Sequence, residues 1–159
     1  MGRPLPKAPL IAGALALVAV AALVGVQLAA MRSRADVTMC AASLRSLYIA
    51  VRSGELLDSP KWEAAGHGRA FIANYKLWPT KQQIDFAPFC PVKAEGTDID
   101  YRGPGLPFPR LKTGDPIFAD RVGNHGPGKG GSVCLKDGTV ISCGEDHALW
   151  ARAAVTTAD

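Results

Sequence analysis

The sequence lacks charge over a long N-terminal stretch. No Asp, Glu, Lys or Arg occurs between residues 8 and 31, and only Arg3 and Lys7 are charged before it. All 14 acidic residues and most of the 18 Lys and Arg follow, so the formal net charge of +4 does not indicate a basic surface. Lys and Arg form no cluster with interleaved aromatic residues, which make up 7% of the chain. We therefore expect no nucleic-acid binding.

Two further absences exclude common site chemistry. The four cysteines form no Cys-x-x-Cys pair, a spacing that would favour structural zinc. Asp120, His125 and Ser132 are residue types found in hydrolases, but the sequence around Ser132 contains no nucleophile elbow. We expect neither zinc nor an enzymatic activity.

The uncharged stretch contains an apolar run, Leu10 to Ala30, that is interrupted only by Gln27. As a helix it would be about 30 Å long, which is enough to cross a bilayer core. We predict a leader over residues 1–8 and a transmembrane helix over 9–31. A cleaved signal peptide is the alternative, although its apolar region normally has about 7–15 residues. Arg3 and Lys7 favour a cytoplasmic N-terminus.

Beyond the apolar run the pattern becomes amphipathic, which predicts that the helix continues over residues 32–54 and stops at Gly54. Its apolar positions recur at steps of three and four: Val37, Cys40, Leu44, Leu47, Tyr48 and Val51.

A second helical region is predicted from Ser59, with Pro60 at its first position. Gly66 and Gly68 interrupt it, so one helix and two short helices remain equally open, and His67 between them is expected to be exposed. The expected buried side consists of Trp62, Ala65, Phe71, Ile72 and Tyr75.

The C-terminal third predicts strands. Residues 117–120 form an apolar run that ends in Asp120, and a glycine-rich loop with Asn124 and His125 follows. Residues 132–135 and 139–142 flank Asp137-Gly138, which is a strong hairpin signal because glycine supplies positive φ without strain.

The order of Asp120, Asn124-His125 and Asp137-Gly138 resembles the C-terminal part of pseudopilin-like proteins of the type II secretion and type IV pilus class. In particular it resembles a bacterial subgroup with a His-x9-Asp-Gly motif, although eleven residues separate His125 from Asp137 here. Three further segments resemble the family in order: residues 39–47, Phe89-Cys90-Pro91, and a tyrosine-then-turn element at residues 100–104.

The resemblance implies an α+β fold, with the membrane helix continuing into an amphipathic helix packed on a small antiparallel sheet. It implies a pilin-like ectodomain over residues 55–152 and a non-enzymatic subunit or accessory of a secretion or pilus-like assembly. Its partners would be membrane lipid and other pilin-like or secretion-machinery subunits. The localisation would be the inner membrane, with a cytoplasmic N-terminus and a periplasmic ectodomain.

The N-terminal segment departs from this family. Pro9 and Gly13 stand where the family has its first mature residue and its filament glutamate, and the segment holds no acidic residue. Processing by prepilin peptidase and filament assembly are therefore open. The alternative function is a membrane-anchored binding module that uses the loop around His125 and does not enter a filament.

Cys40, Cys90, Cys134 and Cys143 all follow the anchor, and four cysteines allow three pairings. Disulfides are expected outside the cytoplasm. With Gly138-Thr139 as the hairpin turn, Cys134 and Cys143 would lie opposite each other; with Asp137-Gly138 they would be offset by two on one face. Only the first geometry suits a bridge. Cys40 and Cys90 would then form the second bond.

The last predictions concern the loop and the C-terminus. Because some pseudopilins hold calcium in C-terminal loops, Asp115, Asp120 and Asn124 are weak calcium candidates. The simpler interpretation is that Asp120, Arg121, Asn124 and His125 hold the loop by hydrogen bonds. We expect a short helix near residues 148–151 and a flexible tail over residues 153–159.

Overall fold

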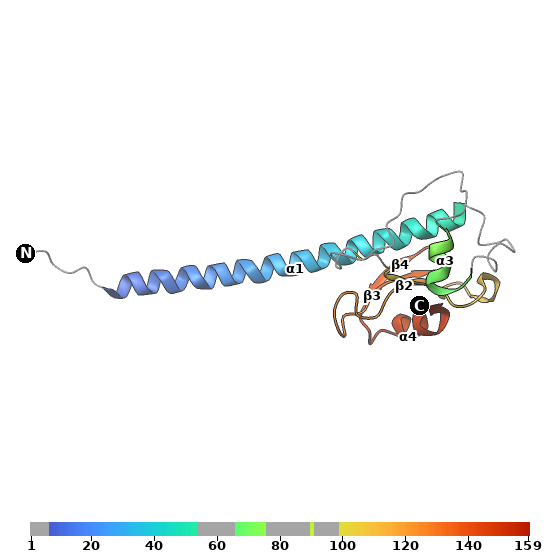
Figure 1. The fold of residues 1–159 in the computed structure, drawn as a ribbon. Helices are drawn as coiled ribbons and strands as arrows, with labels where there is room; N and C mark the ends of the chain where they lie inside the picture. Colours follow the sequence, from blue (N-terminus) through green and yellow to red (C-terminus); the bar gives the residue numbers. More distant parts are fainter. Residues whose placement is uncertain (1–6, 54–65, 76–89, 91–98) are drawn as a thin grey trace, which may run out of the picture. The chain divides into compact units, whose positions relative to one another are not determined.

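The computed structural model describes residues 7–53, 66–75, 90 and 99–159, and the fold is α+β (Figure 1). A long helix, α1 (Lys7–Ser53), precedes a small antiparallel sheet, as predicted. The chain divides into two compact units, Met1–Ala35 and Asp36–Asp159. The predictions for Ser59, Pro60, Trp62, Ala65, Phe89 and Pro91 lie outside the described residues.

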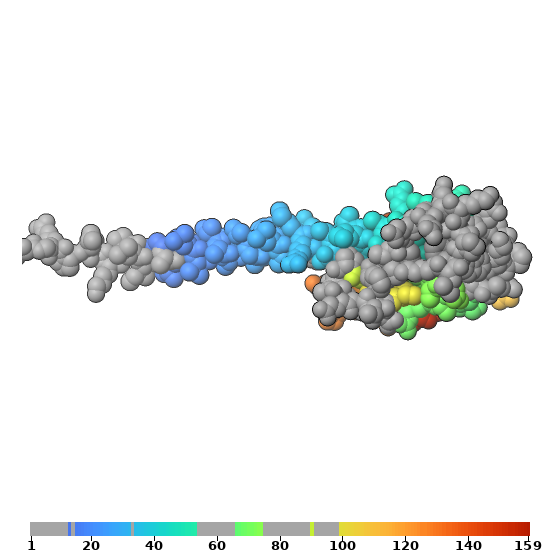
Figure 2. Space-filling view, turned by 45° about the horizontal axis from the view of Figure 1, so that its top comes forward, coloured from blue at the N-terminus to red at the C-terminus, as the bar shows by residue number. Residues whose placement is uncertain are grey.

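The first unit contains the apolar part of α1. Its large apolar side chains from Leu15 to Met31 are exposed, with values from 51% for Val24 to 73% for Leu17 (Figure 2). Among the described residues, α1 is the one helix long and apolar enough to cross a membrane. By length and composition it fits a membrane anchor or a signal sequence.

The second unit is built on a sheet with strand order β4-β3-β2-β1-β5, in which all neighbours are antiparallel. The strands are β1 (Tyr101–Pro104), β2 (Pro116–Asp120), β3 (Gly131–Leu135), β4 (Val140–Cys143) and β5 (Thr157–Ala158). The described helices of this unit, besides the end of α1, are α3 (Gly68–Tyr75), η1 (Phe108–Arg110) and α4 (Ala148–Thr156).

Two apolar clusters lie on opposite faces of this sheet. The larger contains the end of α1, with Phe71 of α3 and Phe118 of β2. The smaller joins Trp150 and Ala153 of α4 to Val133 of β3. The predicted apolar face of α1 is confirmed, because five of its six positions are buried in the larger cluster: Cys40, Leu44, Leu47, Tyr48 and Val51.

Where the resemblance implies a tyrosine followed by a turn at residues 100–104, residues 101–104 form strand β1. It pairs with β2 through Tyr101 and Arg102 and with β5 through Gly103 and Pro104. A Cβ at Gly103 would collide with the backbone of Gly68, so glycine allows the start of α3 to approach the strand closely.

The predicted flexible tail over residues 153–159 is wrong. Residues 153–156 belong to α4, and β5 then adds an edge strand to the sheet. The Thr157 hydroxyl donates to Ala153 O at 2.6 Å, and the buried Arg102 donates to Ala153 O at 3.2 Å and to Thr157 O at 3.4 Å. The polar composition of the tail concealed this role, because its buried hydroxyls find backbone acceptors.

The hairpin between β3 and β4 is confirmed, but both expected turns are wrong. Gly138 N donates to Leu135 O at 2.9 Å, and Leu135 N donates to Thr139 O at 2.8 Å. The loop therefore has three residues and ends in Gly138 with φ of +89°. Its register places Cys134 opposite Val140.

Candidate functional site

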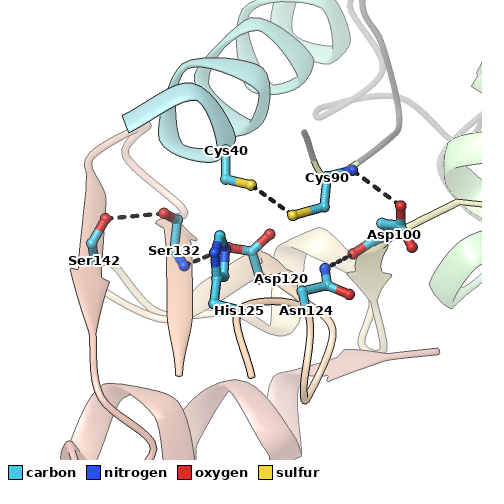
Figure 3. A network of polar contacts seen from close by, with 8 residues as sticks. All are labelled: Cys40, Cys90, Asp100, Asp120, Asn124, His125, Ser132 and Ser142. Carbon is cyan, nitrogen blue, oxygen red and sulfur yellow. Dashed lines mark hydrogen bonds and ion pairs between the residues drawn. The ribbon is translucent and has the colours of Figure 1, made fainter. Parts of the chain in front are cut away.

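Four side chains from separate parts of the second unit meet beside the sheet. Cys40 comes from α1, Asp120 from the end of β2, and His125 from the loop that follows β2. Cys90 lies between α3 and β1 in the sequence. One potential ligand atom from each lies within 4.8 Å of all the others (Figure 3). We call these four residues the Cys-Asp-His cluster.

The two cysteines place their sulfur atoms side by side. The Sγ atoms of Cys40 and Cys90 are 3.2 Å apart, and both residues are fully buried. The hydrogen bond with Cys90, followed by burial, raises the pKa of the Cys40 thiol above its ordinary value. Both residues are thiols in the structure, and the bond expected between them stays a prediction. A thiol held protonated in this way is a poor nucleophile.

Backbone contacts connect Cys90 to the glycine-rich loop. Cys90 N donates to the Asp100 carboxylate at 3.1 Å. The carbonyl of Asp100 accepts from the Asn124 side chain at 2.6 Å and from Arg121 N at 3.2 Å. Asp100 therefore fixes the position of Cys90 relative to the loop that carries His125.

Asp120 is the central residue of the cluster and is fully buried. Its Oδ2 accepts from Ser132 N at 2.7 Å and lies 3.1 Å from His125 Nε2. Its Oδ1 has no hydrogen-bond partner among the described groups. Figure 3 shows the carboxylate directed toward the two sulfurs. A Cβ at Gly131 would lie 2.7 Å from Oδ2, so glycine permits this close contact.

His125 is held by a series of tight turns. Asn124 N donates to Arg121 O at 3.2 Å, and Gly126 N donates to Gly123 O at 3.1 Å. Both glycines have positive φ, which explains the glycine content of the loop. The imidazole points inward, with its side chain 6% exposed. Its hydrogen bond with Asp120 raises the pKa of His125 above the ordinary value.

The structure therefore supports the hydrogen-bonding interpretation of the loop through the side chains of three of the four residues named for it, and through the backbone of Arg121, whose N–H donates to Asp100 O and whose carbonyl accepts from Asn124 N. Asp120, Asn124 and His125 all make hydrogen bonds that hold the loop. The side chain of Arg121 instead forms an ion pair with Asp159 at 3.3 Å, so it contacts the C-terminus.

The predicted calcium ligands do not form one site. Asp115 precedes β2 and Asp120 ends it, a separation of about 16 Å at 3.3 Å per residue. The Asp115 carboxylate is occupied by Lys112 N at 2.6 Å and by Arg152 at 2.7 Å. The Asn124 amide is directed to the carbonyl of Asp100. Only Asp120 belongs to the Cys-Asp-His cluster.

The predicted bridge between Cys134 and Cys143 does not fit this structure. The three-residue loop moves the register by one residue from the expected Asp137-Gly138 turn, and such a shift reverses which face a side chain occupies. Cys134 lies in the larger cluster, whereas Cys143 packs against the smaller one on the opposite face. Burial raises the pKa of Cys134 to about 12.

The Asp137-Gly138 part of the motif lies apart from His125 and has a structural role. Asp137 Oδ1 accepts from Thr139 N at 2.8 Å, which caps the turn. Gly138 packs against the ring of Tyr48, and the Tyr48 hydroxyl donates to Lys136 O at 3.1 Å. These contacts join the hairpin loop to α1.

The sequence singles out each member of the Cys-Asp-His cluster. It predicts a bond between Cys40 and Cys90 and places Asp120 and His125 in one segment, but it does not predict that these two pairs meet. The lack of a Cys-x-x-Cys spacing argues against zinc. Cys40 and Cys90 are 50 residues apart in sequence, and no spacing rule connects them to Asp120 and His125.

Comparisons of the chain with protein-family models, curated proteins and solved structures give no match.

Proposed function

We propose that the protein is a non-enzymatic, membrane-anchored envelope protein of pseudopilin-like type, acting as a subunit or accessory of a type II secretion or pilus-like assembly. The observation that carries the proposal is α1, a single helix that contains both an exposed apolar part and a part buried in the domain core. No loop separates the proposed anchor from the domain.

The exposed part of α1 needs an apolar environment. Leu17, Leu23 and Val26 are each at least 66% exposed, and they lie on a part of the helix that carries no charge. Apolar surface in water costs about 25 cal/mol per Å², so lipid or the helices of partner subunits would cover these side chains. Arg3 and Lys7 support a cytoplasmic N-terminus and a periplasmic domain.

The folded unit supports a scaffolding role better than recognition through His125. A side chain that binds a partner must reach the surface, whereas the imidazole is 6% exposed and directed to Asp120. The loop residues around it are engaged in holding the loop itself. This arrangement favours the assembly subunit over the binding module as the function.

The anchor is tested by placing a charge in the proposed span. Leu23→Lys should release the protein from alkaline-washed membranes, because a lysine near the centre of a span costs about 3 kcal/mol or more. Val122→Lys is the matched control, since Val122 and Leu23 are both 66% exposed and Val122 lies in the folded unit. Release of the wild-type protein by the alkaline wash, or cleavage of residues 1–30 seen in the intact mass, would exclude a permanent anchor.

The assembly is tested separately with a photoreactive amino acid at Leu17 or Val24 in the native membrane. Adducts to further copies or to other pilin-like helices are expected, because these side chains are exposed on α1. A protein that gives only lipid adducts and remains monomeric in mild detergent would contradict the assembly role while retaining the anchor.

A further inference from the structure

We propose that the Cys-Asp-His cluster is a binding site for a tetrahedral, borderline-soft divalent metal, with zinc as the best-fitting ion. The ligands would be the Sγ atoms of Cys40 and Cys90, Oδ1 of Asp120 and a ring nitrogen of His125. The inference does not depend on the anchor or on the assembly role, because all four residues belong to the second unit.

The four donor side chains lie close enough together to surround one metal ion. Zinc bonds of about 2.3 Å to sulfur and 2.0–2.2 Å to nitrogen or oxygen place ligand atoms about 3.3–3.8 Å apart. In the structure the two sulfurs are 3.2 Å apart, and His125 Nε2 is 3.1 Å from Oδ2 of Asp120, the carboxylate whose other oxygen is the proposed ligand. All four ligand atoms lie within 4.8 Å of one another, so small side-chain movements would surround an ion.

The second, independent observation is the buried oxygen of Asp120. Asp120 is 0% exposed, and its Oδ1 finds no hydrogen-bond donor in the part of the chain that the structure describes. Leaving such an oxygen without a partner is destabilising, because the loss of its hydration is not compensated. It belongs to the carboxylate that Figure 3 shows facing Cys40 and Cys90. A cation bound between them would satisfy it.

The donor set selects the kind of metal. Two thiolates and an imidazole suit zinc and other borderline or soft ions, whereas calcium and magnesium require oxygen ligands. The four side chains fill a tetrahedral shell without water, which is typical of a structural site. Ser132 N, 2.7 Å from Asp120 Oδ2, would orient the carboxylate from outside the shell.

Metal binding is balanced by proton release. Each thiol gives up its proton to solvent as its sulfur bonds to the metal, so one Zn²⁺ replaces two protons. A neutral His125 binds through the ring nitrogen that carries no proton, and Asp120 binds as its carboxylate. Two thiolates and one carboxylate offset the 2+ charge of the ion and leave one net negative charge.

A disulfide between Cys40 and Cys90 would be the competing use of the same sulfur atoms. It would explain their contact, but it would offer no donor to Asp120 Oδ1. It would also give no reason for His125 to lie at the same point. The metal accounts for all four residues, and it would tie α1 and Cys90 to the end of β2 and the glycine-rich loop.

The test uses the full-length protein in detergent, reduced with a phosphine and freed of metal by chelation. Co²⁺ titration should give one equivalent of a species with thiolate-to-cobalt charge transfer and the intense ligand-field absorption of tetrahedral cobalt. One equivalent of Zn²⁺ should displace it. Cys40 and Cys90 should become protected from alkylation in the zinc-bound protein.

Two variants assign the site. Asp120→Asn should lower Zn²⁺ affinity at least tenfold and alter the cobalt spectrum, and Cys90→Ser should abolish the charge-transfer band. The matched control is Cys143→Ser, because Cys143 lies on the opposite face of the sheet and should leave the spectrum unchanged. Circular dichroism of each variant establishes that it has folded.

Two results would overturn the inference. One is a folded, reduced wild-type protein that gives no tetrahedral cobalt spectrum, whether or not Cys40 and Cys90 were joined by a disulfide as purified. The other is a cobalt spectrum that persists in folded Cys90→Ser and is lost in Cys143→Ser, because the sulfur ligands would then lie elsewhere.

Discussion

Aspartate side chains stabilise turns and irregular segments of the folded unit by accepting hydrogen bonds from backbone N–H groups. Asp100, Asp115, Asp120 and Asp137 each accept a backbone N–H, from Cys90, Lys112, Ser132 and Thr139 respectively. Each carboxylate satisfies a donor that a turn or irregular segment would leave without a partner. Among the described residues, Asp120 is the only one of the four with a buried oxygen that lacks a hydrogen bond. This difference separates the candidate site from the structural contacts.

Asp137 gives a pH prediction at the scale of one residue. The backbone hydrogen bond from Thr139 lowers the pKa of Asp137 below its ordinary value of 3.8. A depressed pKa contributes stability that is present above the ordinary pKa and is lost as the pH falls through the folded-state pKa. Wild-type protein should therefore lose stability below about pH 4 more steeply than Asp137→Asn, which keeps an acceptor oxygen but does not titrate.

The measurement is the free energy of unfolding by denaturant between pH 2 and 7 for both proteins at constant ionic strength. Identical pH dependence of the two curves would show that the turn does not stabilise the ionised carboxylate. Asp146→Asn serves as the comparison, because Asp146 is exposed.

At the scale of elements, the sequence predicted the strongly periodic segments and failed where tertiary contacts decide. The buried side of α1, strand β2 and the existence of the hairpin follow from apolar spacing. The length of the hairpin turn does not follow from apolar spacing, because Asp-Gly suits turns of two or three residues. Strand β5 does not follow from it either, because the tail gains its structure only by pairing with β1. The site required four segments to meet, which no local pattern encodes.

Gly138 tests the contact between the hairpin and α1. Gly138 and Gly114 both have positive φ, at +89° and +87°, so either Ala substitution carries a similar backbone cost of about 1–2 kcal/mol. A Cβ at Gly138 would collide with the Tyr48 ring, whereas a Cβ at Gly114 would have no atom within 4 Å. Gly138→Ala should therefore destabilise the protein by about 1–3 kcal/mol more than Gly114→Ala.

Thermal and denaturant unfolding of the two variants give this difference directly. Truncation of Tyr48 separates the collision with its ring from the backbone cost at Gly138. The double variant Tyr48→Ala, Gly138→Ala should be destabilised by less than the sum of the two single changes. Equal destabilisation by Gly138→Ala and Gly114→Ala would mean that the hairpin loop does not press against α1.

At the scale of the whole molecule, the chain combines two units with different solvent requirements. The first exposes uncharged apolar side chains, and the second has two apolar clusters of its own on either side of a five-stranded sheet. The described core residues of both clusters all lie at position 40 or beyond. The fold of the second unit therefore needs no residue of the first for its core.

Removal of residues 1–35 should consequently yield a water-soluble domain with the same stability as the domain in the full chain. The remaining helix, residues 36–53, retains the buried side chains that pack on the sheet, including Cys40, Leu44 and Val51. The midpoint of thermal unfolding of the shortened domain should lie within a few degrees of that measured for the full chain in detergent, since a shift of 1 kcal/mol corresponds to about 4–8 °C in a domain near this size.

The comparison fragment begins at residue 45 and lacks Cys40 and Leu44. That fragment should unfold at markedly lower temperature, because losing one buried leucine side chain costs about 2–5 kcal/mol. If the fragment from residue 36 aggregates or unfolds while the full chain remains folded, the first unit is part of the folding unit, and the division between a lipid-facing helix and a self-sufficient domain is incorrect.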